Sequence, residues 1–264
     1  MTVGENHAAQ EHELVAHQRS FGGEITAYYQ AVLDNLHWPG GSNGDRVAVR
    51  TLGVTSYRRG EGVTTVAAGL AATAAASEHG PVLLVEVSTE PPTLHEVFDL
   101  PMPVPESSAN GNGNGNGNGY GERRFAAPIA MGEAAPADAE LPIQVERAAQ
   151  PTAVSNLHLL SSEAIAPSQH GRLAIDRIAQ AAAAATSKFE LVVLDLPAAG
   201  TRSAAIHLAG LLDGVLLVVE AEGVRWESVN RLRQLLDRAG ANVAGAILNK
   251  RRRYTPRWFE EDDE

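Results

Sequence analysis

Residues 51–65 read TLGVTSYRRGEGVTT, and this stretch decides the fold. Its first half is apolar and rich in β-branched residues, which is typical of a buried strand. Gly60 and Gly62 then supply a flexible turn, and an alanine-rich stretch from Thr64 to Ser77 has the composition of a helix. The run 79–81 reads HGP and ends that helix, because proline cannot continue it. The order strand, glycine turn and helix predicts an α/β domain.

Further apolar runs alternate with helical patterns along the rest of the chain. The expected strands are the runs 47–56, 82–87, 191–196, 215–220 and 243–249. Helical patterns lie between the later strands, at 168–186, 202–211 and 226–239. Continuous apolar strands that alternate with helices predict a mostly parallel sheet with helices on both faces. Ligands of such sheets bind beyond the carboxyl ends of the strands.

Two regions outside this alternation differ in composition. Residues 1–44 are expected to form one or two amphipathic helices over 10–36, followed by a glycine-rich linker. The stretch 101–151 contains an Asn-Gly repeat and an Ala/Pro/Glu-rich segment, which cannot bury enough apolar surface to fold. We expect a disordered insertion there, either a flexible spacer or a partner-binding segment around 123–125. The remaining domain spans 45–250, and 251–264 form a charged tail.

Composition excludes several classes of protein. The 264 residues include no cysteine, so disulfides and thiolate metal sites are excluded. The net charge of −11 argues against broad contact with nucleic acid. The sequence shows no signal peptide and no apolar stretch near the roughly 20 residues that cross a bilayer. We expect a cytoplasmic protein, free or held at the inner face of the membrane.

The basic cluster 250–253 is either a solvated strand exit or a contact for an anionic membrane or an acidic partner.

The glycine turn has the position of a Walker A phosphate-binding loop, GxxxxGK[ST], between a strand and a helix. In such a loop, backbone N–H groups surround the phosphates, the lysine reaches them, and the hydroxyl binds Mg²⁺. Thr64 keeps the hydroxyl, but Val63 stands at the lysine position. This change removes a charge-assisted hydrogen bond worth roughly 1.5–3 kcal/mol. Arg58 or Arg59 either compensates from within the loop or lies in solvent.

With these motifs, the chain resembles the cytoplasmic domains of bacterial tyrosine kinases of capsule and exopolysaccharide synthesis, in the wider group of MinD and ParA ATPases. The family loop reads close to TSxxPGEGKST, and the matching residues are Thr55, Ser56, Gly60, Glu61, Gly62, Thr64 and Thr65. The resemblance implies a P-loop NTPase-like fold. It also implies that residues 60–65 bind the nucleotide and that Asn249 approaches its base. Arg58 is added to this nucleotide site as the loop residue that could replace the missing charge. From the residues alone, Asn249 is equally a turn residue.

Two strand ends carry the carboxylates that the resemblance makes functional. The family pattern DxDxRRPxLHxxF corresponds to 86–98, where Glu86 replaces the first aspartate and Ser88 the second. The pattern FDxVIIDTPP corresponds to 189–197, which places Asp195 where a carboxylate holds Mg²⁺. The implied metal site is therefore Thr64, Glu86 and Asp195, with both carboxylates also catalytic. Without the resemblance, Asp195 is equally a helix cap or turn residue.

Several departures from the family pattern occur together. The loop lysine, the two aspartates and the C-terminal tyrosine cluster are all missing, and only Tyr254 lies near the C-terminus. The leading hypothesis is a regulatory or scaffold pseudokinase of polysaccharide synthesis or export, with weakened or lost ATP binding. The alternatives are an active ATP-dependent tyrosine kinase and a positioning ATPase of the MinD kind. The resemblance implies ATP and Mg²⁺, against which the missing lysine counts. It also implies a membrane chain-length regulator as partner, and homo-oligomers.

Overall fold

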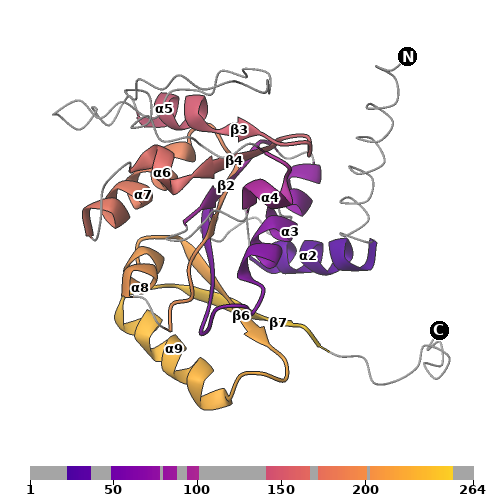
Figure 1. Cartoon of the computed structure of the whole chain (residues 1–264), viewed down its shortest axis with the longest axis vertical. Helices are drawn as coiled ribbons and strands as arrows, with labels where there is room; N and C mark the ends of the chain where they lie inside the picture. Colours follow the sequence, from indigo (N-terminus) through magenta and orange to yellow (C-terminus); the bar gives the residue numbers. More distant parts are fainter. Residues whose placement is uncertain are drawn as a thin grey trace, which may run out of the picture.

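The computed structural model describes residues 23–36, 49–77, 80–87, 94–100, 141–166, 172–200 and 203–251. Within this part of the chain, seven strands form one sheet in the order β3-β4-β2-β5-β1-β6-β7 (Figure 1). Every neighbouring pair is parallel except β3 with β4. The strands are β1 Thr51–Ser56, β2 Val82–Glu86, β3 Gln150–Pro151, β4 Leu157–Ser161, β5 Leu191–Asp195, β6 Gly214–Glu220 and β7 Val243–Asn249.

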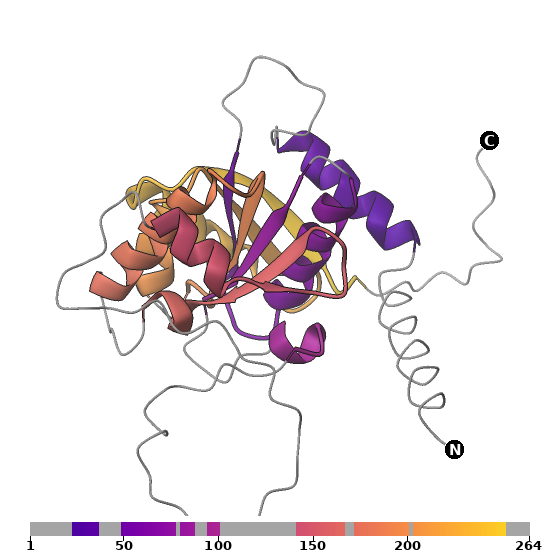
Figure 2. The same ribbon diagram turned by 90° about the horizontal axis from the view of Figure 1, so that it is seen from above.

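Helices cover both faces of the sheet, and each face has its own apolar core. The first core includes Leu33, Leu70 and Leu94, and the second includes Val145, Ile178, Leu208 and Leu236. Figure 2 shows the indigo and purple helices on one side of the sheet and the salmon and orange helices on the other. The helices of the first side are α2 Gly23–Asn35, α3 Val63–Ala76 and α4 Leu94–Val97. Those of the second side are α5 Leu141–Ala148, α6 Ser162–Ile165, α7 Arg172–Ala185, α8 Ser203–Ala209 and α9 Trp226–Arg238.

This arrangement confirms the predicted fold class, a mostly parallel sheet of the P-loop type with helices on both faces. β1 lies between β5 and β6 in the interior of the sheet, and all six of its residues are buried. Its continuous apolar sequence is therefore explained by neighbours on both sides and both faces. β1 begins at Thr51, four residues later than predicted, and α2 lies inside the predicted helical stretch 10–36.

One boundary differs from the prediction. α5 and β3 lie within 101–151, so the prediction of disorder is wrong for residues 141–151. The helix is stable because Val145 is fully buried in the second core and α5 packs against α7. The strand β4 was not predicted at all. The Asn-Gly repeat, residues 1–22 and the tail from 252 onward lie outside the described residues.

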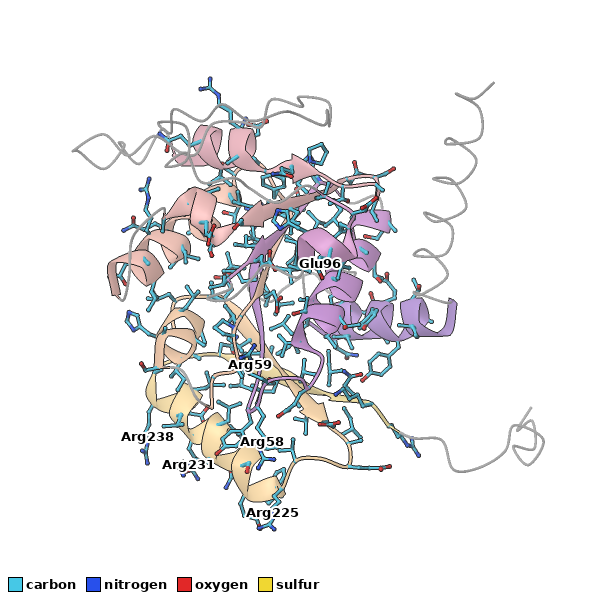
Figure 3. All side chains as sticks on the ribbon, in the orientation of Figure 1. Arg58, Arg59, Glu96, Arg225, Arg231 and Arg238 are labelled. Atoms are coloured by element: carbon cyan, nitrogen blue, oxygen red, sulfur yellow. The ribbon has the colours of Figure 1, made fainter. Side chains whose placement is uncertain are left out.

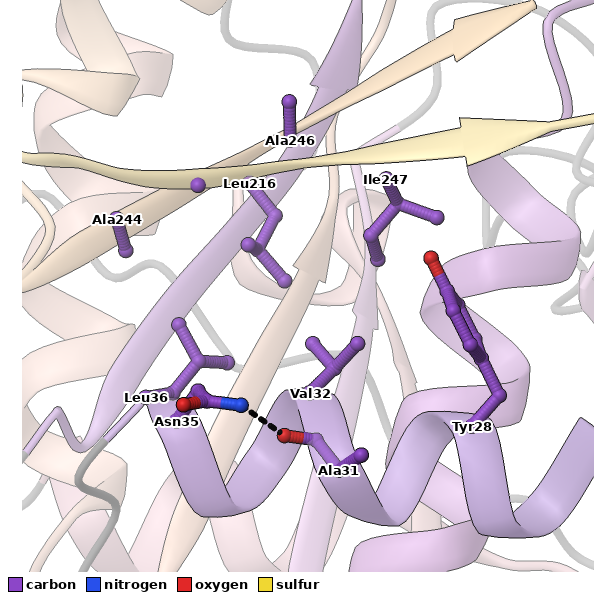
Figure 4. A pocket seen from close by; sticks show the side chains of 10 residues that line it. Tyr28, Ala31, Val32, Asn35, Leu36, Leu216, Ala244, Ala246 and Ile247 are labelled. Carbon is purple, nitrogen blue, oxygen red and sulfur yellow. Dashed lines mark hydrogen bonds between the residues drawn. The ribbon is translucent and has the colours of Figure 1, made fainter. Parts of the chain in front are cut away.

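The helix α2 joins the first core through Tyr29, Leu33 and Leu36. A Cβ atom added at Gly69 of α3 would lie 2.2 Å from the Tyr29 ring, so the two helices pack closely at this point. Toward β7 the packing is looser, and a pocket of about 290 Å³ opens beside Tyr28 (Figure 4). None of the described helices has both the length and the apolar character needed to cross a membrane.

Candidate phosphate-loop site

The carboxyl ends of the parallel strands bring the predicted site residues to one edge of the sheet. Glu86 and Asp195 are register partners at the ends of β2 and β5. The glycine loop leaves the end of β1, which lies next to β5. Asn249 ends β7, where it pairs with Glu220 of β6. The topology thus places the loop, the two carboxylates and Asn249 at this one edge of the sheet.

The loop has the backbone of a phosphate cradle. Gly60 and Gly62 take φ values of 83° and 95°, a left-handed conformation that other residues adopt only with strain. The helix α3 begins directly after Gly62, and no side chain caps its N-terminus. The first N–H groups of a helix have no partner within the helix, so an anion can accept from them here. The loop residues thus fit the phosphate part of a nucleotide.

Glu61 stabilises this loop from inside. Its side chain is buried, with 1% of its surface exposed, and its Oε1 accepts a hydrogen bond from the Arg58 backbone N–H at 2.8 Å. Burial raises the pKa of the Glu61 carboxyl, although the Arg58 N–H opposes this shift. The hydroxyl of Ser56 donates to the Arg58 carbonyl at 2.6 Å. Glu61 therefore closes the turn by a local contact and presents its carboxylate to the protein interior.

Thr64 and Asp195 form the metal side of the site. The Thr64 hydroxyl donates to Oδ2 of Asp195 at 2.8 Å, although the two residues are 131 positions apart. Burial raises the pKa of Asp195 to about 7, and the charge of Glu86 adds to this rise, whereas the Thr64 hydrogen bond lowers it. A hydroxyl beside a carboxylate is a donor set that Mg²⁺ accepts in P-loop proteins. These two residues fit the predicted metal site.

Glu86, the third residue of the predicted metal site, is engaged elsewhere. Its Oε1 accepts from the Leu94 backbone N–H at 2.9 Å, and its Oε2 lies 3.1 Å from Nδ1 of His95. Both contacts come from the start of α4, and Glu86 and His95 are almost fully buried. Glu86 therefore holds α4 against the end of β2. Metal binding by this carboxylate would break contacts that the fold uses.

The structure also places Val63, Arg58 and Thr65 of the predicted loop site. Val63 packs against the first core and offers no donor. The Arg58 guanidinium lies over the Tyr57 ring, with Cζ 5.9 Å from the ring centroid. Arg58 is labelled in Figure 3. Thr65 is exposed on the first turn of α3. In the described part of the chain, no group of three or more His, Cys, Asp or Glu side chains could hold a metal ion.

Sequence reasoning missed one residue that touches the loop. Lys250, which follows β7, donates from Nζ to the Gly60 carbonyl, and its Nζ lies 3.4 Å from Oε1 of Glu220. Its neighbour Asn249 donates from Nδ2 to the Glu61 carbonyl at 2.9 Å. In the sequence, Lys250 was grouped with the basic cluster 250–253. The feature that could have identified Lys250 as a loop contact is its position directly after Asn249, at the end of a strand from which the side chain can reach the loop.

Comparison with known proteins supports the resemblance stated above. No protein-family model matches the chain. CapB of Staphylococcus aureus, assigned as a tyrosine-protein kinase, is 23% identical over 226 residues, which cover 86% of this chain and 84% of CapB. The relation therefore extends over most of both chains and is not limited to the glycine loop.

Solved structures show that the fold is shared with kinase domains. The chimerical protein CapA2B2 has a TM-score of 0.61 and 18% identity, with 91% of this chain and 90% of that chain covered. The VpsO kinase domain has a TM-score of 0.56 and 18% identity, with coverage of 93% and 98%. The kinase domain of the Escherichia coli tyrosine kinase ETK has a TM-score of 0.54 and 20% identity, with coverage of 78% and 71%.

Proposed function

Since the chain is related to the cytoplasmic domains of bacterial tyrosine kinases, we propose that it is a regulatory or scaffold component of capsule or exopolysaccharide synthesis in which phosphoryl transfer is reduced or lost. The proposal combines a retained fold with an incomplete catalytic site. Its partner, by family resemblance, is a membrane chain-length regulator, which would hold the protein at the inner face of the membrane. Assembly of several copies is part of the same proposal.

The proposal rests on three positions where the family pattern has functional residues, which are Val63, Glu86 and Asp195 in this chain. Val63 cannot supply the charge that stabilises transferred phosphates, and transition-state charge is what P-loop enzymes chiefly stabilise. Glu86 is committed to α4 through both carboxylate oxygens. Of these three positions, only Asp195 keeps a carboxylate beside the loop, where it accepts a hydrogen bond from the Thr64 hydroxyl. One substitution can be compensated, but two at the same site favour loss of the reaction.

ATP and Mg²⁺ remain the cofactors that the loop could hold. The loop N–H groups would donate to the phosphate oxygens, and Thr64 with Asp195 would ligate the metal ion, which would supply charge neutralisation when bound. Because the pKa of Asp195 is raised to about 7, a large share of this side chain carries a proton at neutral pH. A metal ion must displace that proton, so we expect Mg²⁺ binding to weaken as the pH falls below about 7.

A deletion and complementation experiment tests the role in polysaccharide synthesis. We expect that removing the gene from its host changes the amount or chain length of the extracellular polysaccharide. Asp195→Ala should restore both to the wild-type level, because the proposed role does not require phosphoryl transfer. Polymer amount and size distribution are measured by carbohydrate assay and gel filtration.

Two outcomes would reject the proposal, in different ways. An unchanged polymer after deletion would show that the protein has no part in polysaccharide synthesis. A polymer that is restored by the wild-type gene but not by Asp195→Ala, at equal protein level and with an unchanged circular dichroism spectrum, would show that phosphoryl transfer is needed.

A further inference from the structure

We propose that Asn249 and Lys250 are positioning residues that set the glycine loop as a phosphate cradle from the end of β7, replacing the restraint that a loop lysine would give. This inference rests on the proposed function only in assuming that the loop can still hold a phosphate group. We refer to the two residues as the β7 clamp. They donate to two consecutive carbonyl groups of the loop, those of Gly60 and Glu61.

The orientation of these two carbonyls fixes the direction of two N–H groups. A peptide unit is planar and trans, so its N–H points away from its carbonyl. The Gly60 carbonyl shares a peptide unit with the Glu61 N–H, and the Glu61 carbonyl shares one with the Gly62 N–H. Because the β7 clamp draws both carbonyls toward β7, both N–H groups point away from it. Backbone N–H groups at this place in a loop are the donors that surround a phosphate.

The clamp is in close contact with the loop. A Cβ atom added at Gly62 would lie 2.2 Å from Nδ2 of Asn249, which is far inside van der Waals contact. The φ of 95° at Gly62 also requires glycine, because other residues adopt this value only with strain. Glycine at this position therefore serves both the turn and the approach of the asparagine amide.

The backbone of the clamp is itself held in an uncommon conformation. Asn249 is anchored in the sheet, because its carbonyl accepts from the Ala221 N–H at 2.9 Å. Lys250 then takes a φ of 56°, in the left-handed region that a residue with a side chain adopts only with strain. Such conformations persist where surrounding contacts stabilise them. Here the turn brings the Lys250 ammonium back onto the loop.

Charge explains why a lysine is useful at this point. The carboxylate of Glu220 lies 3.4 Å from Nζ of Lys250. A phosphate near this carboxylate would meet repulsion unless a cation lay nearby. Lys250 provides a cation in direct contact with the loop backbone, at a site where Val63 provides none.

The test measures pyrophosphate binding to the full chain by isothermal titration calorimetry, with and without Mg²⁺. We expect the wild-type protein to bind, and Lys250→Met and Asn249→Ala to bind about tenfold more weakly, as loss of a charge-assisted or loop-orienting hydrogen bond implies. Lys250→Arg should recover part of the affinity. The matched control is Lys188→Met, since Lys188 has the same 46% exposure and one carboxylate partner, Glu146.

A second readout separates positioning from stability. Amide hydrogen exchange at Glu61 and Gly62 should become faster in both clamp variants. The thermal midpoint of Lys250→Met should stay within about 2 °C of the wild-type value, because Lys250 is exposed. Unchanged pyrophosphate affinity in both variants would overturn the inference. A wild-type protein that does not bind pyrophosphate would also overturn it, and would leave the regulatory role standing, because that role is judged by polymer production.

Discussion

Glu86→Ala is expected to destabilise the fold by about 2–5 kcal/mol, because two buried groups lose their hydrogen-bond acceptor, at roughly 1–3 kcal/mol each. The carboxylate has 1% of its surface exposed and contacts both the Leu94 N–H and the His95 ring. Alanine would leave these two groups without their acceptor in the interior and would free α4 from the end of β2. The free energy of unfolding, measured by urea denaturation, checks the prediction.

The control for this variant lies on the same helix. Glu96 of α4 is exposed, so Glu96→Ala should change the free energy of unfolding by no more than about 0.5 kcal/mol. Glu86→Gln keeps one acceptor oxygen and should lose less stability than Glu86→Ala. If the free energy of unfolding of Glu86→Ala instead lies within about 1 kcal/mol of the wild-type value, Glu86 does not anchor α4. Its carboxylate would then be available for a metal ion.

The second large effect is expected at Asp195, where replacement by asparagine should stabilise the protein above neutral pH. Burial raises the pKa of Asp195 from its ordinary value of 3.8 to about 7, so the folded protein binds this proton more tightly than the unfolded chain does. Stability therefore falls as the pH rises through the range between these two values and is constant above it. A shift of this size corresponds to about 4 kcal/mol as an upper bound.

Asp195→Asn removes this charge and keeps an oxygen that can accept from Thr64. We expect the stability difference between variant and wild type to be small near pH 4 and to grow to a plateau of up to about 4 kcal/mol by pH 8. Denaturant unfolding across this pH range measures it. The exposed Asp237 of α9 is the control, and Asp237→Asn should give a small difference at every pH. An asparagine variant less stable than the wild type at pH 8 would contradict the assignment.

The fold was largely predictable because its strands are continuous apolar runs. The runs that form β1, β2, β5, β6 and β7 are continuously apolar, and this composition alone indicates strands that are buried on both faces. The helix α5 was missed because its residues follow a low-complexity stretch of similar composition. Its stability depends on contact with α7, which no local pattern of the sequence reveals. Tertiary packing decided this element, not helix propensity.

The site shows the same division. The two loop glycines, and the meeting of Thr64 with Asp195, follow from the order strand, loop, helix and from the shared edge of a parallel sheet. The role of Glu86 could not be predicted, because its partners lie on α4, eight and nine positions further along the chain. No local sequence pattern shows that α4 packs against the end of β2. The contact of Lys250 with Gly60 spans 190 positions and depends on the left-handed turn after β7.

We propose that the protein keeps the phosphate cradle of a tyrosine kinase but not its reaction. The most direct test incubates the purified chain with Mg·ATP and measures phosphotyrosine by mass spectrometry, with Asp195→Ala as the control. We predict that neither protein acquires phosphotyrosine. Robust labelling of the wild-type protein that disappears in Asp195→Ala would contradict the claim and would establish an active kinase.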